Sequence, residues 1–152
     1  MTLLCVGRLG AAPENALARD YAARATAAGR ALGLGPVELV EVEGRKPGKA
    51  AEAEALLARL DGAHLIACDE HGAALTSRDF AGLLQALRDE GERKLAFAIG
   101  GADGLAAGVL QAARRRLAFG VQTWPHALAR VMLAEQIYRA TTILAGGPYH
   151  RD

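Results

Sequence analysis

The side chains best suited to chemistry gather near the end of this chain, in the segment Pro148-Tyr149-His150-Arg151-Asp152. Terminal residues are usually the least constrained of a protein, yet these offer an aromatic ring, an imidazole and a guanidinium. Histidine exchanges a proton near neutral pH, and arginine keeps its charge and binds anions. We therefore predict that Tyr149, His150 and Arg151 are functional residues; the alternative is a tail that docks only for stability.

A second candidate is the glycine-rich turn that follows the apolar run from Phe97 to Ile99. Gly100, Gly101 and Gly104 form the pattern G-G-x-x-G, and glycine lets backbone N–H groups approach a ligand closely. The spacing differs from the G-x-G-x-x-G of dinucleotide-binding proteins, and a purely structural turn explains it equally well. By itself the pattern is compatible with both a ligand-binding loop and a structural turn.

Two more arginines lie in the segment from His126 to Leu144, for which the pattern predicts a long helix. Its polar residues scatter around the helix instead of forming one face, so we expect burial on more than one side and a subunit interface. Arg130 and Arg139 would then be paired or directed into a site. Glu135 and Arg139 stand at i,i+4, so the two could equally satisfy each other.

Only local clusters of positive charge point to a nucleic-acid partner, because the net charge of the whole chain is +1. We predict that two such clusters contact RNA phosphates, while a solvated face or turn is the alternative for both. The first is an arginine run and the second lies in a loop broken by glycine and proline. Their residues are Arg114, Arg115 and Arg116, and Arg45, Lys46 and Lys49.

We expect these residues to sit on an α/β fold, a mostly parallel sheet with helices on both faces. The chain has 152 residues, 51% of them hydrophobic, which suits one domain, residues 1–152, with a packed core. Strand and helix patterns alternate, and ligands bind such sheets at loops following the strands, here 69–72, 100–104 and 120–125. The predicted strands are 2–6, 37–42, 64–68, 95–99 and 117–121, and the predicted helices are 13–32, 50–60, one capped by Thr76, 105–113 and 126–144.

Cysteine usage and the N-terminus indicate the setting of the protein. Cys5 and Cys68 lie in apolar runs without C-x-x-C spacing, which predicts buried free thiols and no metal site. The apolar run at residues 2–6 is too short for a signal peptide or a membrane span. We expect a cytoplasmic protein that makes no membrane contact.

Several motifs of the last third of the chain occur together in one known protein family. They are Ile99-Gly100-Gly101-Ala102-Asp103-Gly104-Leu105, Thr123-Trp124-Pro125-His126, Arg130-Val131, Glu135-Gln136-Ile137-Tyr138-Arg139-Ala140 and the terminal Pro148-Tyr149-His150-Arg151. With them the chain resembles the RlmH family over its whole length. Members of that family are SPOUT-class methyltransferases that methylate N3 of a pseudouridine in large-subunit (23S) rRNA.

The resemblance implies a C-terminal trefoil knot within the α/β fold, an obligate homodimer, and rRNA in the ribosome as the substrate. It also implies that S-adenosylmethionine is the cofactor and is held in the knot. We hypothesise that the tail closes the active site of the partner subunit. By position, the cofactor-binding residues would be Cys68, Gly100, Gly101, Gly104, Phe119, Gly120, Val121, Gln122, Thr123 and Trp124.

The resemblance also assigns catalytic roles. N3 of pseudouridine is mostly protonated at neutral pH, so a general base, or cations that stabilise its anion, would help the reaction. His150 would be that general base or a positioning group. Tyr149 would stack on a nucleobase of the RNA or order the tail. The cations that could hold the anion or RNA phosphates are Arg151, Arg139 and Arg130.

Two other functions remain compatible with the residues. One is a non-enzymatic ribosome-binding or assembly module with the same dimeric fold. The other is a phosphate- or nucleotide-binding α/β protein that uses the turn from Gly100 to Gly104 as an anion site. Selective binding of S-adenosylmethionine over ATP and NAD discriminates the methyltransferase from both.

Overall fold

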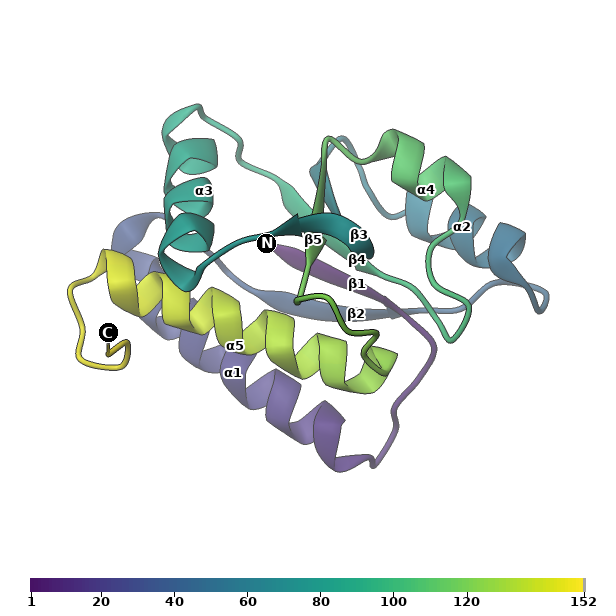
Figure 1. The fold of residues 1–152 in the computed structure, drawn as a ribbon, viewed down its shortest axis with the longest axis horizontal. Coiled ribbons are helices and arrows are strands. Elements are labelled where there is room, and N and C mark those ends of the chain that lie inside the picture. Colours follow the sequence, from purple (N-terminus) through teal and green to yellow (C-terminus); the bar gives the residue numbers. More distant parts are fainter. Residues whose placement is uncertain (152) are drawn as a thin grey trace.

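The centre of the computed structural model, which describes residues 1–151, is a five-stranded parallel sheet of order β2-β1-β4-β3-β5 (Figure 1). All five residues of β4 are buried, as expected of a central strand with helices on both faces. The strands are β1 (Thr2–Val6), β2 (Glu38–Val42), β3 (His64–Ala74), β4 (Leu95–Ile99) and β5 (Arg115–Ala118).

Helices cover both faces of this sheet, and successive side chains of each strand point to opposite faces (Figure 1). Leu3 packs toward α1, α3 and α5, whereas Leu4 packs toward α2 and α4. The α/β class with a parallel sheet is therefore confirmed. The helices are α1 (Pro13–Gly29), η1 (Arg30–Leu32), α2 (Lys49–Leu57), α3 (Ser77–Asp89), α4 (Ala107–Ala112) and α5 (His126–Leu144).

The predicted turn at residues 69–72 is wrong, because β3 continues through it to Ala74. The strand pairs with β5 on both sides of this stretch, and its register shifts between Cys68 and Ala73. Cys68 and Ala73 both pair with Leu117, so the four residues between them leave the ladder, and their polar and glycine residues look like a turn in the sequence. Gly72 lies so close to β5 that a Cβ there would be 2.6 Å from the Leu117 nitrogen.

The predicted fifth strand at residues 117–121 is displaced, since β5 runs from Arg115 to Ala118 and Val121 is 100% exposed. Arg115 and Arg116 pair through their backbones with Ile66 and Ala67 of β3. Charged side chains are tolerated here because β5 is an edge strand with one open side. The start of β5 was therefore predicted too late in the chain, because its first residues are arginines.

Helix α5 is buried on several sides, as its scattered polar residues predicted. Its cover comes from the same chain, namely α1, α3 and the sheet, so burial of this helix does not itself require a second subunit. The hydroxyls of the buried Thr141 and Thr142 donate to the carbonyls of Tyr138 and Arg139, at 2.7 and 2.8 Å. Within residues 1–151, no helix has the length and apolar character needed to cross a membrane.

Candidate functional site

A cavity of about 470 Å³ lies at the carboxyl ends of β4 and β5 and beside residues 68–71 of β3. We call it the strand-end pocket, and its volume is typical of small-molecule sites. All the predicted cofactor-binding residues line it except two: Gly120 lines a different groove, and Val121 faces away into solvent. The lining residues used below are Lys49, Cys68, Asp69, Glu70, His71, Gly100, Gly101, Asp103, Gly104, Phe119, Gln122, Thr123, Trp124 and His126.

The glycine turn forms one wall of this pocket from backbone alone. A Cβ on Gly100 would lie 2.5 Å from the carbonyl carbon of Gly104, so no other residue fits there without a shift of the chain. Gly104 N–H donates to the Gly101 carbonyl at 3.1 Å, and its φ of +72° lies in the region that favours glycine. A ligand can therefore approach the main chain of this turn closely.

The opposite wall is the loop between β5 and α5, which two hydrogen bonds hold in place. The indole N–H of Trp124 donates to the Phe119 carbonyl at 3.2 Å, closing the loop on itself. Thr123 Oγ1 donates to Glu70 Oε2 at 2.7 Å, and this bond joins the loop to the extended end of β3. Segments from two distant parts of the sequence thus form one rigid rim.

The charged side chains of the strand-end pocket are mostly acidic. Asp69, Glu70 and Asp103 face a single lysine, Lys49, and Asp69 Oδ1 also accepts from the backbone N–H of His71 at 3.0 Å. Such a lining attracts a cationic ligand and opposes a polyphosphate. Sequence reasoning assigned none of these carboxylates to the site, although the position of Asp69 and Glu70 after a predicted strand could have indicated them.

Both cysteines are free, as predicted. Burial raises the pKa of the Cys5 thiol to about 12 and raises that of Cys68, which lines the pocket, well above its usual range. A thiol that stays protonated is a poor nucleophile. Cys68 therefore contributes an apolar surface to the pocket.

The predicted catalytic residues of the tail form a cluster with α5. Tyr149 OH donates to Glu135 Oε1 at 3.0 Å, and the Arg139 guanidinium lies 4.8 Å from the centre of the Tyr149 ring. Arg139 also bonds Glu135, the pairing that their spacing allowed, and its Nη1 lies 3.4 Å from His150 Nδ1. Arg151 is exposed beside them. The structure thus brings together Tyr149, His150 and Arg139.

The tail cluster and the strand-end pocket lie at different positions along α5, the pocket at its first turns and the tail cluster beside Glu135 and Arg139. His126, the first residue of α5, lines the pocket, and the tail follows the last residue, Leu144. Tyr149 contacts Glu135 and His150 contacts Arg139, and these two residues lie about 14 and about 20 Å along the helix axis from His126. The tail therefore lies outside the pocket of its own chain.

Arg130 lies in neither cluster. Its side chain is 0% exposed, and Nη2 donates to the carbonyls of Val6 and Gly7 at the end of β1. Nη1 lies 3.3 Å from Glu41 Oε1, which also accepts from the Leu9 N–H at 2.9 Å. In this position Arg130 joins α5 to the ends of β1 and β2.

The predicted RNA-binding residues occupy two regions of the surface. Arg114 pairs with Glu92 at 2.8 Å, whereas Arg115 and Arg116 are exposed on the edge strand. The other cluster flanks the strand-end pocket, since Lys49 opens α2 and lines that pocket. Arg45 and Lys46 are exposed in the loop before it.

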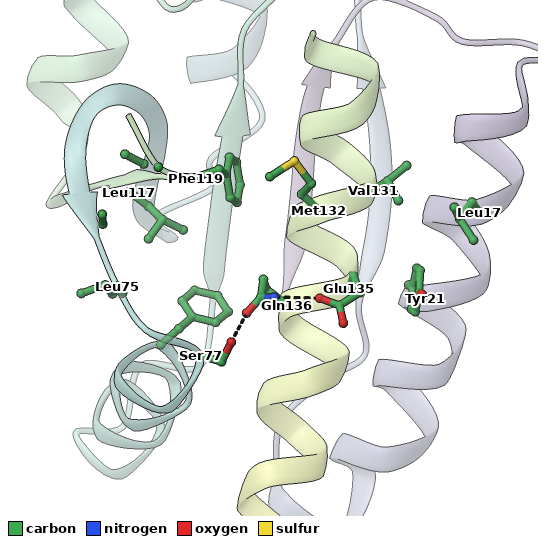
Figure 2. Close-up of a pocket in the computed structure, with 14 residues that line it drawn as sticks. Leu17, Tyr21, Leu75, Ser77, Leu117, Phe119, Val131, Met132, Glu135 and Gln136 are labelled. Atoms are coloured by element: carbon green, nitrogen blue, oxygen red, sulfur yellow. Dashed lines mark hydrogen bonds between the residues drawn. The ribbon is translucent and has the colours of Figure 1, made fainter. Parts of the chain in front are cut away.

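A second, largely apolar groove of about 500 Å³ separates α5 from β5 and α3 (Figure 2). We call it the α5 groove; Leu17 and Leu75 on its rim are 46% and 39% exposed. Figure 2 shows Met132 and Phe119 facing each other across it, and the Ser77 hydroxyl donating to Gln136 Oε1 at 2.9 Å. Exposed leucines around a groove are typical of surfaces that another protein covers.

The fold and a family comparison together define the class of protein. The family described as "Predicted SPOUT methyltransferase" matches residues 1–150, and the chain belongs to that family. Two solved structures share the fold. A probable methylase family protein from Haemophilus influenzae Rd KW20 gives a TM-score of 0.53 at 15% identity, over 99% of this chain and 69% of that one. A probable methyltransferase from Bordetella pertussis Tohama I gives 0.52 at 21%, over 92% and 94%.

Closer relatives identify the branch of that family. The chain is 66% identical to the ribosomal RNA large subunit methyltransferase H of Caulobacter vibrioides, covering 100% of this chain and 98% of the relative. It is 64% identical to the protein of that name from Phenylobacterium zucineum, covering 100% and 99%. The predicted membership of the RlmH family is confirmed.

Proposed function

We propose that this protein transfers a methyl group from S-adenosylmethionine to N3 of a pseudouridine in large-subunit rRNA, in the ribosome and hence in the cytoplasm. The observation that carries the proposal is the strand-end pocket, a cavity with a glycine backbone wall and an acidic lining. The names of the relatives supply the rRNA substrate class. Pseudouridine N3 is the target that the family motifs imply.

The residues of the strand-end pocket fit this cofactor. S-adenosylmethionine, when bound, supplies a methyl group on a cationic sulfonium, which is a strong methyl donor by itself. The glycine turn and the loop from Phe119 to Trp124 would hold it through backbone groups. The carboxylates of Asp69, Glu70 and Asp103 would compensate its positive charge, whereas ATP and NAD would meet repulsion.

The chain's own residues would prepare the nucleotide. Pseudouridine N3 must lose its proton, and we assign the acceptor role, or the positioning of N3, to His150. Arg139 contacts the His150 ring and is itself held by Glu135, so it orients the imidazole. Because Arg151 is exposed, it can hold the developing anion or an RNA phosphate, and Tyr149 orders the tail through Glu135.

The proposal includes a homodimer in which the tail of one subunit completes the pocket of the other. Two observations support it: no residue of the described tail lines the pocket of its own chain, and the α5 groove leaves apolar side chains exposed. It also includes a trefoil knot in the C-terminal region and a single domain over residues 1–152, both of which family membership supports.

Two measurements test the function. In calorimetry, the purified protein should bind S-adenosylmethionine and give no heat with ATP or NAD. Mass mapping of large-subunit rRNA from cells lacking the gene should show the loss of one methyl group from a pseudouridine, restored by the gene. A folded protein that does not bind S-adenosylmethionine would favour the assembly-module or nucleotide-binding alternatives. Unchanged methylation of the rRNA would refute the proposal that large-subunit rRNA is the substrate.

A further inference from the structure

A third cavity, of about 490 Å³, lies between α3 and the edge strand β5. We call it the β5–α3 groove. It shares Leu117 with the strand-end pocket, so the two cavities are neighbours. Apolar residues of three segments form much of its lining, and small or charged residues complete it. The residues are Ile66, Ala73, Leu75, Leu83 and Leu117, with Asp79, Gly82, Ala86, Arg115 and Arg116.

The charges of this groove favour an anion. The side chains of Arg115 and Arg116 are exposed, and within residues 1–151 neither guanidinium forms a hydrogen bond or ion pair, whereas the adjacent Arg114 pairs with Glu92. The one carboxylate of the groove, Asp79, is engaged in the cap of α3, where it accepts from Thr76 Oγ1 at 2.6 Å. Two uncommitted guanidinium groups therefore dominate the local field.

Gly82 keeps the α3 side of the groove open. It lies in the interior of α3, is exposed, and has no positive φ. A Cβ added there would meet no atom within 4 Å, so neither packing nor backbone strain requires glycine. Glycine destabilises a helix interior relative to alanine. What the missing side chain does provide is space over Leu83 and Ala86 in the groove.

We propose that the β5–α3 groove binds a single-stranded segment of the rRNA substrate that flanks the target nucleotide. An unstacked base would lie on the apolar lining around Leu83, with its phosphates held by Arg115 and Arg116. Guanidinium planes and apolar surfaces stack on the faces of single-stranded bases. In a duplex these faces are covered by the neighbouring base pairs. This inference rests on the proposed methyltransferase function and adds the path of the RNA beside the strand-end pocket.

A charge inserted into the groove tests the proposal. Gly82→Glu places a carboxylate between the arginines and the RNA, and Gly108→Glu is the matched control. Gly108 is an exposed helix residue of α4, on the other face of the sheet, and a Cβ there also meets nothing within 4 Å. Methylation of ribosomes from cells lacking the gene should show KM raised about tenfold by Gly82→Glu. The kcat at saturation, the affinity for S-adenosylmethionine, and the KM of Gly108→Glu should stay unchanged.

If Gly82→Glu does not fold, a second variant tests whether the groove binds RNA. Arg115→Ala with Arg116→Ala should lower the slope of log affinity for ribosomes against log salt by about 1.4, since each single-stranded phosphate contact contributes about 0.7. An unchanged slope, or an unchanged KM in a folded Gly82→Glu protein, overturns the groove as an RNA site. Wild-type protein that methylates no ribosomes would instead refute the proposed function, so the two failures are distinct.

Discussion

Arg130 shows how a residue suited to catalysis can serve the fold. Sequence alone presents it as an arginine on an apolar helix, in a motif shared with methyltransferases. In the structure its guanidinium is fully buried and bonded to two carbonyls and a carboxylate at the ends of β1 and β2. A buried cation with these partners is costly to disturb, because removing it leaves the acceptors unpaired.

We predict that Arg130→Met lowers the free energy of unfolding by about 3 kcal/mol, since Glu41 and the carbonyls of Val6 and Gly7 lose their donor. Urea denaturation measures this change. Arg130→Lys should recover only part of the loss, because one ammonium cannot reproduce the planar fork. If Arg130→Met were as stable as the wild type yet inactive, a direct catalytic role would be the better interpretation.

At the scale of elements, the tail is held by a network of aromatic rings and one carboxylate. The Tyr149 and Tyr138 rings are 4.7 Å apart, and Glu135 accepts from both Tyr149 and Arg139. Burial, followed by the hydrogen bonds with Tyr21 and Glu135, raises the pKa of Tyr149 above its ordinary value of 10.0. Ionisation of this phenol would place a negative charge against Glu135.

We therefore predict that the tail undocks in alkaline solution. The docked state holds the Tyr149 proton more tightly than the free tail, so the stabilisation is complete below about pH 10 and is lost as pH rises through the raised pKa. The protection of residues 145–151 against hydrogen exchange, relative to the free-peptide rate at each pH, should fall over that range. Tyr149→Phe is the control, because it should abolish this pH dependence; an identical profile in both proteins would contradict the assignment.

The limits of helices and strands could be predicted from the sequence where a single hydrophobic pattern ran through the whole element. Strands β1 and β4 and helix α5 have the expected limits, because short apolar runs and a long apolar helix leave few alternatives. β3 and β5 were misjudged because they pair at the edge of the sheet, where a bulge and charged residues replace the usual alternation. The acidic lining of the strand-end pocket was missed because it depends on which loops the fold brings together.

At the scale of the whole molecule, the two candidate halves of an active site are separated within one chain. The strand-end pocket adjoins the start of α5, whereas the tail cluster is docked on Glu135 and Arg139, in the middle and second half of this helix. In the proposed homodimer, the tail of a second subunit would reach the pocket while the tail of each chain stays outside its own pocket. The exposed leucines of the α5 groove provide apolar surface for such a contact.

Subunit complementation tests this arrangement. One variant is a chain truncated after Pro148, which lacks the tail. The other is Asp103→Arg, which places a positive charge at the pocket that should exclude the cationic cofactor. Each variant should be inactive alone. Coexpressed, they should regain about one quarter of the wild-type rate, because half of the dimers are mixed and hold one working site each. Calorimetry should show that the truncated dimer still binds S-adenosylmethionine. An inactive mixture would mean that pocket and tail act within one chain.

Helix α5 also bears on how such a protein can change over evolutionary time. It leads from the rim of the strand-end pocket to the tail, and Arg130 fixes its first half while Glu135 and Arg139 hold the tail against its middle and second half. One inserted residue would shift everything beyond it by about 1.5 Å and rotate it by about 100°. The length of this helix therefore sets where the tail lies relative to Arg130, and we expect an insertion or deletion between them to separate the tail from Glu135 and Arg139.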